Sequence, residues 1–418
     1  MDYKKQRTID WSLILLYLLM VVLGWLSIYS SSYDPGNISH FFSFNSIAKK
    51  QLLFIFIAVI ISSTILFMDV KILPKISYLI YGICMSSLIL VLFVGKEVGG
   101  AKAWFDFGLF GIQPAEFAKI GTTLAIAKFI NNKKIYLNSW KKIIQVSLFF
   151  LTPILLILKQ PDAGSALVYT SFLIMFYREG LSLKYVISVI IIGTVSITTI
   201  IFGIHNTIIY LVFTGLVFAY ILFKNKKSLI PALLFFIFSA LISMGVNYAY
   251  DEIIPKHQKE RIDLIIGKEQ NLLGSGYNLN QSLIAIGSGG ILGKGFLKGT
   301  QTKFNFVPEQ NTDFIFCTIG EEFGFAGSVF IIILFIALIS RIIFLSEKHV
   351  SRFSRIFGYS VASIFFSHIF INISMTLGLM PIIGIPLPFF SYGGSSLLSF
   401  TILLFMFIKM DQKRSDRF

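Results

Sequence analysis

Charged residues are scarce in this sequence of 418 residues, and that scarcity excludes most soluble folds. Asp, Glu, Lys and Arg make up 14% of the chain, against about 25% in a typical soluble domain. Apolar residues reach 55%, Phe alone contributes 44 residues, and the mean hydropathy is +0.78. At about 20 residues per membrane span, this content fills ten or more helices. A soluble enzyme, a disordered chain and an outer-membrane barrel of alternating strands are excluded. The composition predicts an all-α polytopic membrane protein.

Cysteine and the common motifs of soluble chemistry are also rare or missing. The two cysteines, Cys84 and Cys317, lie in apolar segments, so we expect two buried small side chains and no disulfide. The sequence shows no Walker motif, no Ser/His/Asp set and no metal-ligand spacing. An ATP-driven pump is therefore disfavoured, and no metal site is predicted.

Twelve apolar stretches, bounded by charged residues, Gly or Pro, are predicted to be helices of a single membrane domain over residues 1–418. They cover residues 11–30, 52–68, 76–94, 114–130, 143–158, 163–177, 185–203, 207–223, 229–248, 314–340, 356–377 and 388–408. The Pro and Gly residues at 159–164 predict a tight re-entry turn between two of them. The first stretch is too long for the apolar core of a signal peptide, so we expect a retained first span.

The net charge of +15 predicts an orientation in the membrane and no nucleic-acid partner. With the N-terminus in the cytoplasm, the cytoplasmic segments hold 22 of the 36 lysines and arginines, and the short outer loops hold five. Cytoplasmic loops of membrane proteins carry such an excess of Lys and Arg. Both termini are therefore predicted to be cytoplasmic.

Two loops on the predicted outer side differ from the rest. Residues 249–312 form a long segment of mixed polarity, in which residues 281–286 are predicted to be a short interfacial helix. A loop of this length is uncommon in a compact protein unless it is functional. The last outer loop, from Gly378 to Ser396, has three prolines and four glycines in 19 residues, which predicts a rigid, non-helical loop. Irregular backbone near membrane depth is tolerated only where it lines a cavity or is buried in protein.

Ionisable side chains in apolar segments are candidate site residues, because a charge at membrane depth is costly. Asp313 opens the apolar run that starts at Phe314. It is either an N-cap or first-turn acid of the next helix or the carboxylate of a site at the outer boundary. Glu116 and Lys119 lie at i and i+3 just after Pro114, a plausible first helical position. They form a structural ion pair, line a polar outer cavity, or do both.

The remaining ionisable candidates are more isolated. Asp162 lies in the broken turn, Lys102 lies beside Trp104, and His368 lies inside an apolar run, where a satisfied core histidine is the usual outcome. Glu321 and its neighbour Glu322 point about 100° apart on a helix, so they do not form a clamp for one metal ion. Together, the polar features converge on the outer half of the protein and predict an outward-facing polar cavity.

Several short segments recur in an order that resembles one known family. They are Gly100–Trp104, Gln113–Lys119, Gln160–Gly164, Gln281–Ser282 with Gly287–Gly295, Pro308–Phe316, Gly320–Glu322 and Gly384–Ser396. In this order they resemble the SEDS family (shape, elongation, division and sporulation) of RodA and FtsW lipid II polymerases. The residues Gly299–Gln301 and Phe306–Glu309 are more similar to the RodA, or elongation, branch than to the FtsW, or division, branch.

The resemblance implies a peptidoglycan glycosyltransferase that polymerises lipid II into glycan strands at the outer face of the bacterial cytoplasmic membrane, for cell elongation and rod shape. Asp313 falls on the family's essential carboxylate, and we expect it to act as general base. The departing pyrophosphate needs cations. Lys102, Lys119, Arg261 and Lys294 are the candidates for that role. Trp104 and the last outer loop, which includes Ser391, are expected to position sugar or lipid. Glu116, Asp162 and Glu321 complete the expected cavity.

The resemblance also implies partners and leaves alternatives open. The expected partners are the nascent glycan strand, a class B penicillin-binding protein that supplies the transpeptidase, the elongation machinery and membrane lipid. No cofactor is identified, although a divalent cation that assists the pyrophosphate stays open. The alternatives are a flippase or transporter of lipid-linked precursor, an FtsW-like division polymerase, and a non-catalytic scaffold.

The chain departs from the family pattern in two places. It has twelve apolar stretches where relatives are expected to have ten spans, and the extra pair is predicted to be an inserted helix pair at residues 207–248. The residues Gln310-Asn311 stand before Thr312, where the family commonly has His. This second departure puts a role for that side chain in doubt, but not the role of Asp313.

Overall fold

The computed structural model describes residues 9–33, 46–108, 110–132, 140–226, 228–254, 256–267, 276–303 and 306–414. The chain forms two compact units, one of Met1–Gly180 with Tyr277–Phe418 and one of Leu181–Gly276. Part of the predicted outer loop at 249–312 lies outside the described residues, as do the basic residues Lys4, Lys5 and Arg7.

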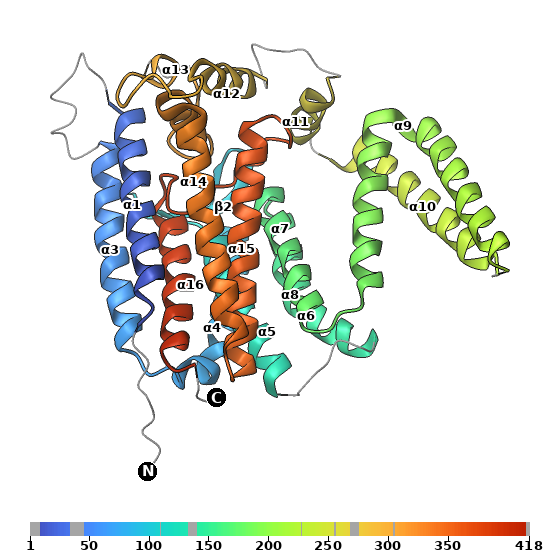
Figure 1. Cartoon of the computed structure of the whole chain (residues 1–418), viewed down its shortest axis with the longest axis horizontal. Helices are drawn as coiled ribbons and strands as arrows, with labels where there is room; N and C mark the ends of the chain where they lie inside the picture. The colour runs from blue at the N-terminus through green and yellow to red at the C-terminus, as the bar shows by residue number, and fades with distance from the viewer. Residues whose placement is uncertain are drawn as a thin grey trace. The chain divides into compact units, whose positions relative to one another are not determined.

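The first unit is a bundle of long helices around α15 and α16 (Figure 1). These two helices are the most enclosed of the candidate spans among the described residues, with 78% and 89% of their most apolar stretches buried. The peripheral helices expose many of their apolar side chains, as lipid-facing helices do. The long helices of this unit are α1 (Trp11–Ser31), α3 (Ile47–Phe67), α4 (Ile72–Val94), α5 (Pro114–Asn132), α6 (Trp140–Leu158), α14 (Ile315–Glu347), α15 (Arg352–Thr376) and α16 (Gly394–Gln412).

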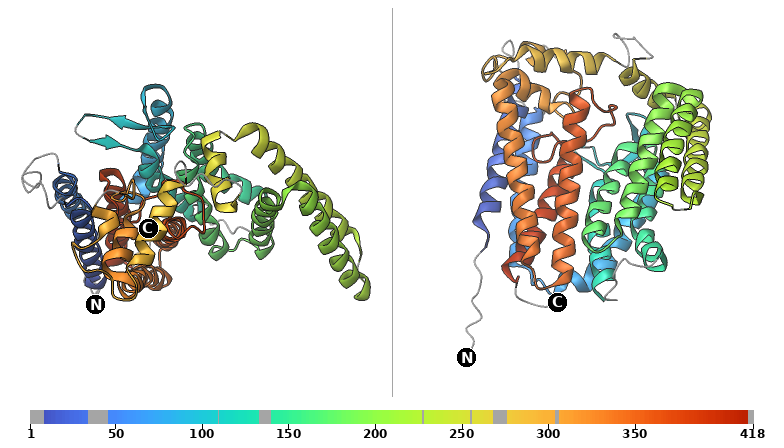
Figure 2. Two further views of the ribbon diagram at one scale, coloured as in Figure 1. Left: turned by 90° about the horizontal axis from the view of Figure 1, so that it is seen from above. Right: turned by 45° about the vertical axis from the view of Figure 1, so that its right-hand side comes forward.

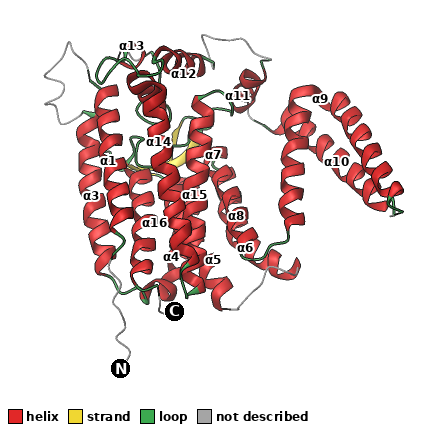
Figure 3. Cartoon of the chain, in the orientation of Figure 1, coloured by secondary structure: helices red, strands yellow, loops and turns green. Residues whose placement is uncertain are grey.

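Helices make up almost all of the regular structure (Figure 3), and the prediction of an all-α polytopic membrane protein is confirmed. Within the described residues, nine helices are long and apolar enough to cross a membrane, so the count of twelve spans is not confirmed. The stretch at 163–177 consists of three short pieces, α7 (Ala163–Val168), a 3-10 turn (Tyr169–Ser171) and α8 (Phe172–Arg178). The stretches at 185–203 and 207–223 are two helices that meet at a sharp break at Gly203 and together make up α9 (Leu183–Lys224).

A small antiparallel sheet, which the sequence did not predict, follows α4. Its strands β1 (Lys96–Val98), β2 (Ala101–Asp106) and β3 (Gly111–Ile112) pair in the order β1-β2-β3. Gly99 and Gly100 form the turn between β1 and β2, and both have positive φ. A two-residue hairpin turn of this kind favours glycine at both positions.

Two short helices of the outer segment pack against the beginning of α14. They are α12 (Tyr277–Ser288) and α13 (Thr300–Lys303). The prediction of a short helix at 281–286 is therefore confirmed, and α12 extends it at both ends. The last loop, residues 377–393 between α15 and α16, contains no helix or strand, as its prolines and glycines predict. We call it the closing loop.

The second unit contains α9, α10 (Ile230–Tyr248), a π-helical turn (Ala249–Ile253) and α11 (Lys256–Ile266). Within it, α9 and α10 pack along each other, and the Thr199 hydroxyl donates to the Ser243 hydroxyl at 2.9 Å. The predicted helix pair at 207–248 falls in this unit, and its status as an insertion stays a prediction.

Ion pairs join the helices of the first unit at the end where α1 begins and α16 ends (Figure 2). They connect α1, α8, α14 and α15 to one another or close the last turn of α16. The pairs are Asp10–Arg341 (2.6 Å), Arg178–Glu347 (2.7 Å), Glu179–Arg352 (2.9 Å) and Asp411–Arg414 (2.6 Å). Because α14 runs from Ile315 to this end, its beginning lies at the opposite end of the bundle.

Candidate functional site

Asp313 lies just before α14, at the end of the bundle opposite the ion pairs. The helix begins at Ile315, and Phe314 occupies its N-cap position. The interpretation of Asp313 as an N-cap or first-turn acid is therefore wrong, because the helix starts two residues later. The residue is half-buried in a turn at residues 308–314.

The closing loop holds the backbone around Asp313. The Ser391 hydroxyl donates to the Thr312 carbonyl at 2.6 Å, and the Tyr392 N–H donates to the Asn311 carbonyl at 2.7 Å. These bonds fix the main chain on which the Asp313 carboxylate is carried. Ser391, which belongs to the loop expected to position sugar or lipid, thus joins that loop to the residue before Asp313.

The Asp313 carboxylate faces a glycine of the closing loop. Gly384 has φ +69°, and a Cβ added to it would lie 3.3 Å from Asp313 Oδ2. A side chain at this position would be strained by the backbone and would press on the carboxylate. Glycine therefore lets the loop approach Asp313 closely.

Two other helices, α1 and α7, approach the backbone of the closing loop closely at glycines. A Cβ at Gly164 on α7 would lie 2.2 Å from the Ile383 carbonyl oxygen, and one at Gly24 on α1 would lie 2.2 Å from the Phe389 carbonyl oxygen. Backbone can approach this closely only where no side chain intervenes. The loop is thus packed in protein on several sides, which is the condition for irregular backbone at membrane depth.

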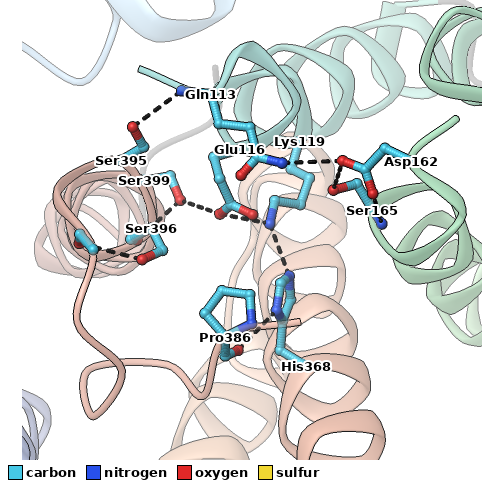
Figure 4. Close-up of polar contacts among 11 residues, drawn as sticks. Gln113, Glu116, Lys119, Asp162, Ser165, His368, Pro386, Ser395, Ser396 and Ser399 are labelled. Carbon is cyan, nitrogen blue, oxygen red and sulfur yellow. Dashed lines mark hydrogen bonds and ion pairs between the residues drawn. The ribbon is translucent and has the colours of Figure 1, made fainter. Parts of the chain in front are cut away.

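A buried polar cluster lies between α5, α15 and α16 (Figure 4). The predicted pair on α5 forms, with Lys119 Nζ 2.8 Å from Glu116 Oε2, and both residues are 2% exposed. Lys119 Nζ also lies 2.8 Å from His368 Nε2, and the Ser399 hydroxyl donates to Glu116 at 3.0 Å. This enclosure favours a structural ion pair over side chains that line an open cavity.

Asp162 joins the turn before α7 to the start of α5. Its carboxylate accepts from the Ser165 N–H at 2.9 Å and the Ser165 hydroxyl at 2.7 Å, which caps α7. The Gln113 side-chain amide donates to it at 3.0 Å (Figure 4). The predicted turn at 159–164 is confirmed, and Asp162 organises it.

Glu321 is enclosed by the segment that contains Lys294. Its carboxylate accepts from Lys294 Nζ at 2.7 Å and from the first amides of α13, including Thr300 N at 2.7 Å and Thr302 N at 3.0 Å. The side chain is fully buried. Glu322, its neighbour, accepts instead from the Ser30 hydroxyl and from Leu297 N. The two glutamates therefore have different partners. The pair of Glu321 and Lys294 holds α13 and the segment before it against α14.

The remaining predicted site residues lie on the small sheet and in the second unit. Lys102 Nζ donates to the Phe93 carbonyl at the end of α4 at 3.0 Å, and Trp104 lies on β2 opposite Lys96. Arg261 lies on α11 in the second unit. Among the described residues, no group of three or more His, Cys, Asp or Glu side chains is arranged to hold a metal ion.

The sequence pattern missed Asn372, a buried residue of α15. Its side-chain amide donates to the Asp313 carbonyl at 2.8 Å and to the Ile385 carbonyl at 2.7 Å. Both acceptors are backbone carbonyls, which every residue has, so the residue types at 313 and 385 do not indicate a partner for Asn372. The one available signal was its position four residues after His368, on the same helix face.

Comparisons with known proteins agree with this fold. The model of a family described as cell cycle protein (FtsW, RodA, SpoVE) matches residues 10–210 and 205–416. Peptidoglycan glycosyltransferase MrdB of Escherichia coli (strain K12) is 33% identical over 321 residues, which cover 76% of this chain and 73% of MrdB. Peptidoglycan glycosyltransferase RodA of Treponema pallidum (strain Nichols) is 29% identical over 415 residues, which cover 93% of this chain and 94% of RodA.

Solved structures share the architecture over almost the whole chain. A chain from the structure described as "Structural coordination of polymerization and crosslinking by a peptidoglycan synthase complex" has a TM-score of 0.68 and 26% identity, and the match covers 97% of this chain and 98% of that one. The rod shape determining protein RodA of Thermus thermophilus has a TM-score of 0.63 at 24% identity, over all of both chains. This second likeness shows the fold alone.

Proposed function

The chain belongs to the FtsW/RodA/SpoVE family of cell cycle proteins, and on that basis we propose that it polymerises lipid II with Asp313 as its general base. It is a peptidoglycan glycosyltransferase with an elongation role, in line with the relatives that carry this activity in their names. The observation that carries the site is the half-buried Asp313 carboxylate, which faces Gly384 of a loop fixed to the neighbouring backbone.

The proposed reaction forms one bond and breaks another at C1 of the donor sugar. The 4-hydroxyl oxygen of the acceptor sugar attacks C1, and its proton passes to the Asp313 carboxylate. The bond from C1 to the polyprenyl pyrophosphate breaks, and the pyrophosphate leaves with the electron pair. General-base catalysis by a positioned carboxylate contributes about 10²–10⁴-fold.

The negative charge of the departing pyrophosphate needs a cation that is not already neutralised. Lys119 is buried against Glu116, and Lys294 is paired with Glu321, so their charges are already matched. Lys102 is half-buried on β2, the central strand of the sheet, and its ammonium donates to a backbone carbonyl. We therefore favour Lys102 over Lys119 and Lys294 for this task, and Arg261 stays a candidate.

The proposal places the protein in the bacterial cytoplasmic membrane with both termini in the cytoplasm. The beginning of α1 and the end of α16 lie at the same end of the first unit, which supports placing both termini on one side of the membrane, and the excess of Lys and Arg predicts that this side is the cytoplasm. Asp313 is then at the outer face, where lipid II and the growing strand are available. One related structure comes from a peptidoglycan synthase complex in which polymerisation and crosslinking are coordinated, and we propose a class B penicillin-binding protein as this chain's transpeptidase partner.

The direct test is polymerisation of lipid II by the purified chain with its partner, read as glycan strands on a gel. The wild type should form strands, and Asp313→Asn, which keeps the size of the side chain, should lose at least about 10²-fold in rate. Glu252→Gln is the matched control, because Glu252 is an exposed carboxylate of the second unit, outside the turn that carries Asp313.

Each failure in this test has its own meaning. Absence of strands with the wild type would reject the polymerase function, whereas normal strands with Asp313→Asn would reject only the site. Recovery of a division-specific partner in a pulldown would contradict the elongation role.

A further inference from the structure

Two buried side chains on α15 connect Asp313 to the closing loop. His368 and Asn372 lie one helical turn apart on the same face, and they are 1% and 0% exposed. His368 Nδ1 lies 3.3 Å from the Pro386 carbonyl, and Asn372 bonds the carbonyl of the preceding residue, Ile385, at 2.7 Å. We propose that His368 and Asn372 are positioning residues that set the distance between the Asp313 carboxylate and the closing loop.

Asn372 holds both sides of the site with one amide. Its two N–H bonds reach the Asp313 carbonyl and the Ile385 carbonyl. Two carbonyl acceptors require the amide nitrogen on their side, so the orientation of this side chain is determined. Asn372 Oδ1 is buried and has no hydrogen-bond partner in the described part of the chain. A buried unpaired oxygen lowers the free energy of unfolding. The two hydrogen bonds of the amide nitrogen, which bridge two backbone segments, offset this loss.

His368 connects the same loop to the buried ion pair. The Pro386 carbonyl can only accept, so Nδ1 carries the proton, and the Lys119 ammonium can only donate, so Nε2 is the acceptor (Figure 4). The two contacts are consistent with a single neutral tautomer. Lys119 is in turn held by Glu116 at 2.8 Å. The ion pair of α5 thus orients the histidine, and the histidine supports the loop.

The supported loop residues are the ones that face the carboxylate. A Cβ added to Gly384 would lie 3.3 Å from Asp313 Oδ2. Gly384 directly precedes Ile385 and Pro386, whose carbonyls bond Asn372 and His368. If either bond is lost, the loop and the carboxylate can move apart. A misplacement of about 1 Å costs up to about 10²-fold in rate. This inference rests on the proposed function, because it assigns a consequence to the position of Asp313.

A matched pair of substitutions separates the two contacts of His368. In His368→Asn the side-chain amide occupies the place of Nδ1, so it can still donate to Pro386 but no longer reaches Lys119. In His368→Gln the amide occupies the place of Nε2, so it reaches Lys119 and leaves Pro386. Asn372→Leu has the same shape as asparagine and removes both donors. Ser360→Ala is the control, because Ser360 is fully buried on α15 and bonds only within its own helix.

The test is steady-state polymerisation of lipid II by each full-length variant with its partner, together with thermal unfolding in detergent. We expect His368→Gln and Asn372→Leu to lower kcat by about tenfold to a hundredfold, with KM and the unfolding midpoint close to wild type. The kcat of His368→Asn should fall by less than that of His368→Gln, and the kcat of Ser360→Ala should match that of the wild type.

Other results would overturn the inference. Normal kcat in both His368→Gln and Asn372→Leu would remove the positioning role, and so would losses in kcat that track the fall in unfolding midpoint. If Asn372→Leu does not fold, the comparison of His368→Asn with His368→Gln tests the inference. Equal kcat in these two variants would show that the contact of His368 with Pro386 has no positioning role. An active Asp313→Asn would reject the inference together with the site, and an inactive wild type would instead reject the proposed function.

Discussion

Helices α9 and α14 are both long, apolar and broken by a glycine with positive φ. Among the described residues, only at the break in α14 does another segment of the chain hydrogen-bond to the helix. The breaks lie at Gly203 (φ 77°, ψ 164°) and Gly324 (φ 63°, ψ −157°). This backbone region is almost exclusive to glycine. The two helices belong to different units, so each break can be judged by its own surroundings.

At Gly324 the segment before α13 replaces the hydrogen bonds that the helix loses. The Phe325 N–H donates to the Gly290 carbonyl at 2.9 Å, and the Ala326 N–H donates to the Ile291 carbonyl at 3.0 Å. A Cβ at Gly324 would lie 2.4 Å from the Gly293 nitrogen. At Gly203, by contrast, no atom of the described residues lies within 4 Å of an added Cβ. A glycine permits a break, and a second segment with free carbonyls fixes where it lies.

Gly324→Ala should have the largest effect on this comparison. The substitution combines a backbone strain of about 1–3 kcal/mol with a clash against backbone atoms that cannot rotate away, which adds about 1–3 kcal/mol. We expect the free energy of unfolding to fall by roughly the sum of these terms, and polymerisation to be lost with the position of Asp313. Thermal unfolding in detergent measures the effect, and a midpoint equal to wild type would show that the contact with Gly293 does not constrain α14.

Glu321→Gln should loosen the same break from a distance. The carboxylate accepts six hydrogen bonds from Lys294 and residues 300–302, and an amide nitrogen in its place would face N–H donors. Loss of hydrogen bonds to a buried charge costs about 2–3 kcal/mol. Hydrogen exchange of the α13 amides should become much faster, while Glu309→Gln, at an exposed site, should leave them unchanged. Unchanged exchange in Glu321→Gln would mean that α13 is held by its apolar contacts.

Gly203→Ala should have the smallest effect. Alanine is strained in this conformation, but the described residues leave room for the new methyl group, so the break can move or straighten at a cost of about 1 kcal/mol, the low end of such strain. The unfolding midpoint should shift far less than in Gly324→Ala. A loss as large as that of Gly324→Ala would show that the break in α9 is as firmly held, and the contrast between the two helices would disappear.

The sequence predicted the local features of the site well because they depend on neighbours along the chain. The pair Glu116 and Lys119 was predicted from its i, i+3 spacing, and the start of α5 from Pro114. The irregular closing loop was predicted from its prolines and glycines. In each case, helix geometry or turn chemistry determines the outcome without tertiary contacts.

Features that depend on backbone atoms far away in sequence were not predictable. Asn372 bonds two carbonyls, and a carbonyl is present at every residue, so no pattern marks the partners. The same holds for the amides around Glu321. The count of twelve spans stays unconfirmed, because hydropathy does not show whether the two halves of α9 on either side of Gly203 each cross the membrane.

The ion pairs at the end of the bundle where α1 begins give several arginines a second task. Arg178, Arg341, Arg352 and Arg414 are among the residues whose charge predicts the orientation, and insertion responds to Lys and Arg while acidic residues count little. In the folded protein each of these arginines is matched by a carboxylate. The charge of these four arginines is therefore balanced locally once the helices have assembled. The net charge of +15 already counts these carboxylates, so the pairs leave the total charge unchanged and fix where the helix ends lie. With the predicted orientation, the same four side chains first bias insertion and then hold the assembled helices together.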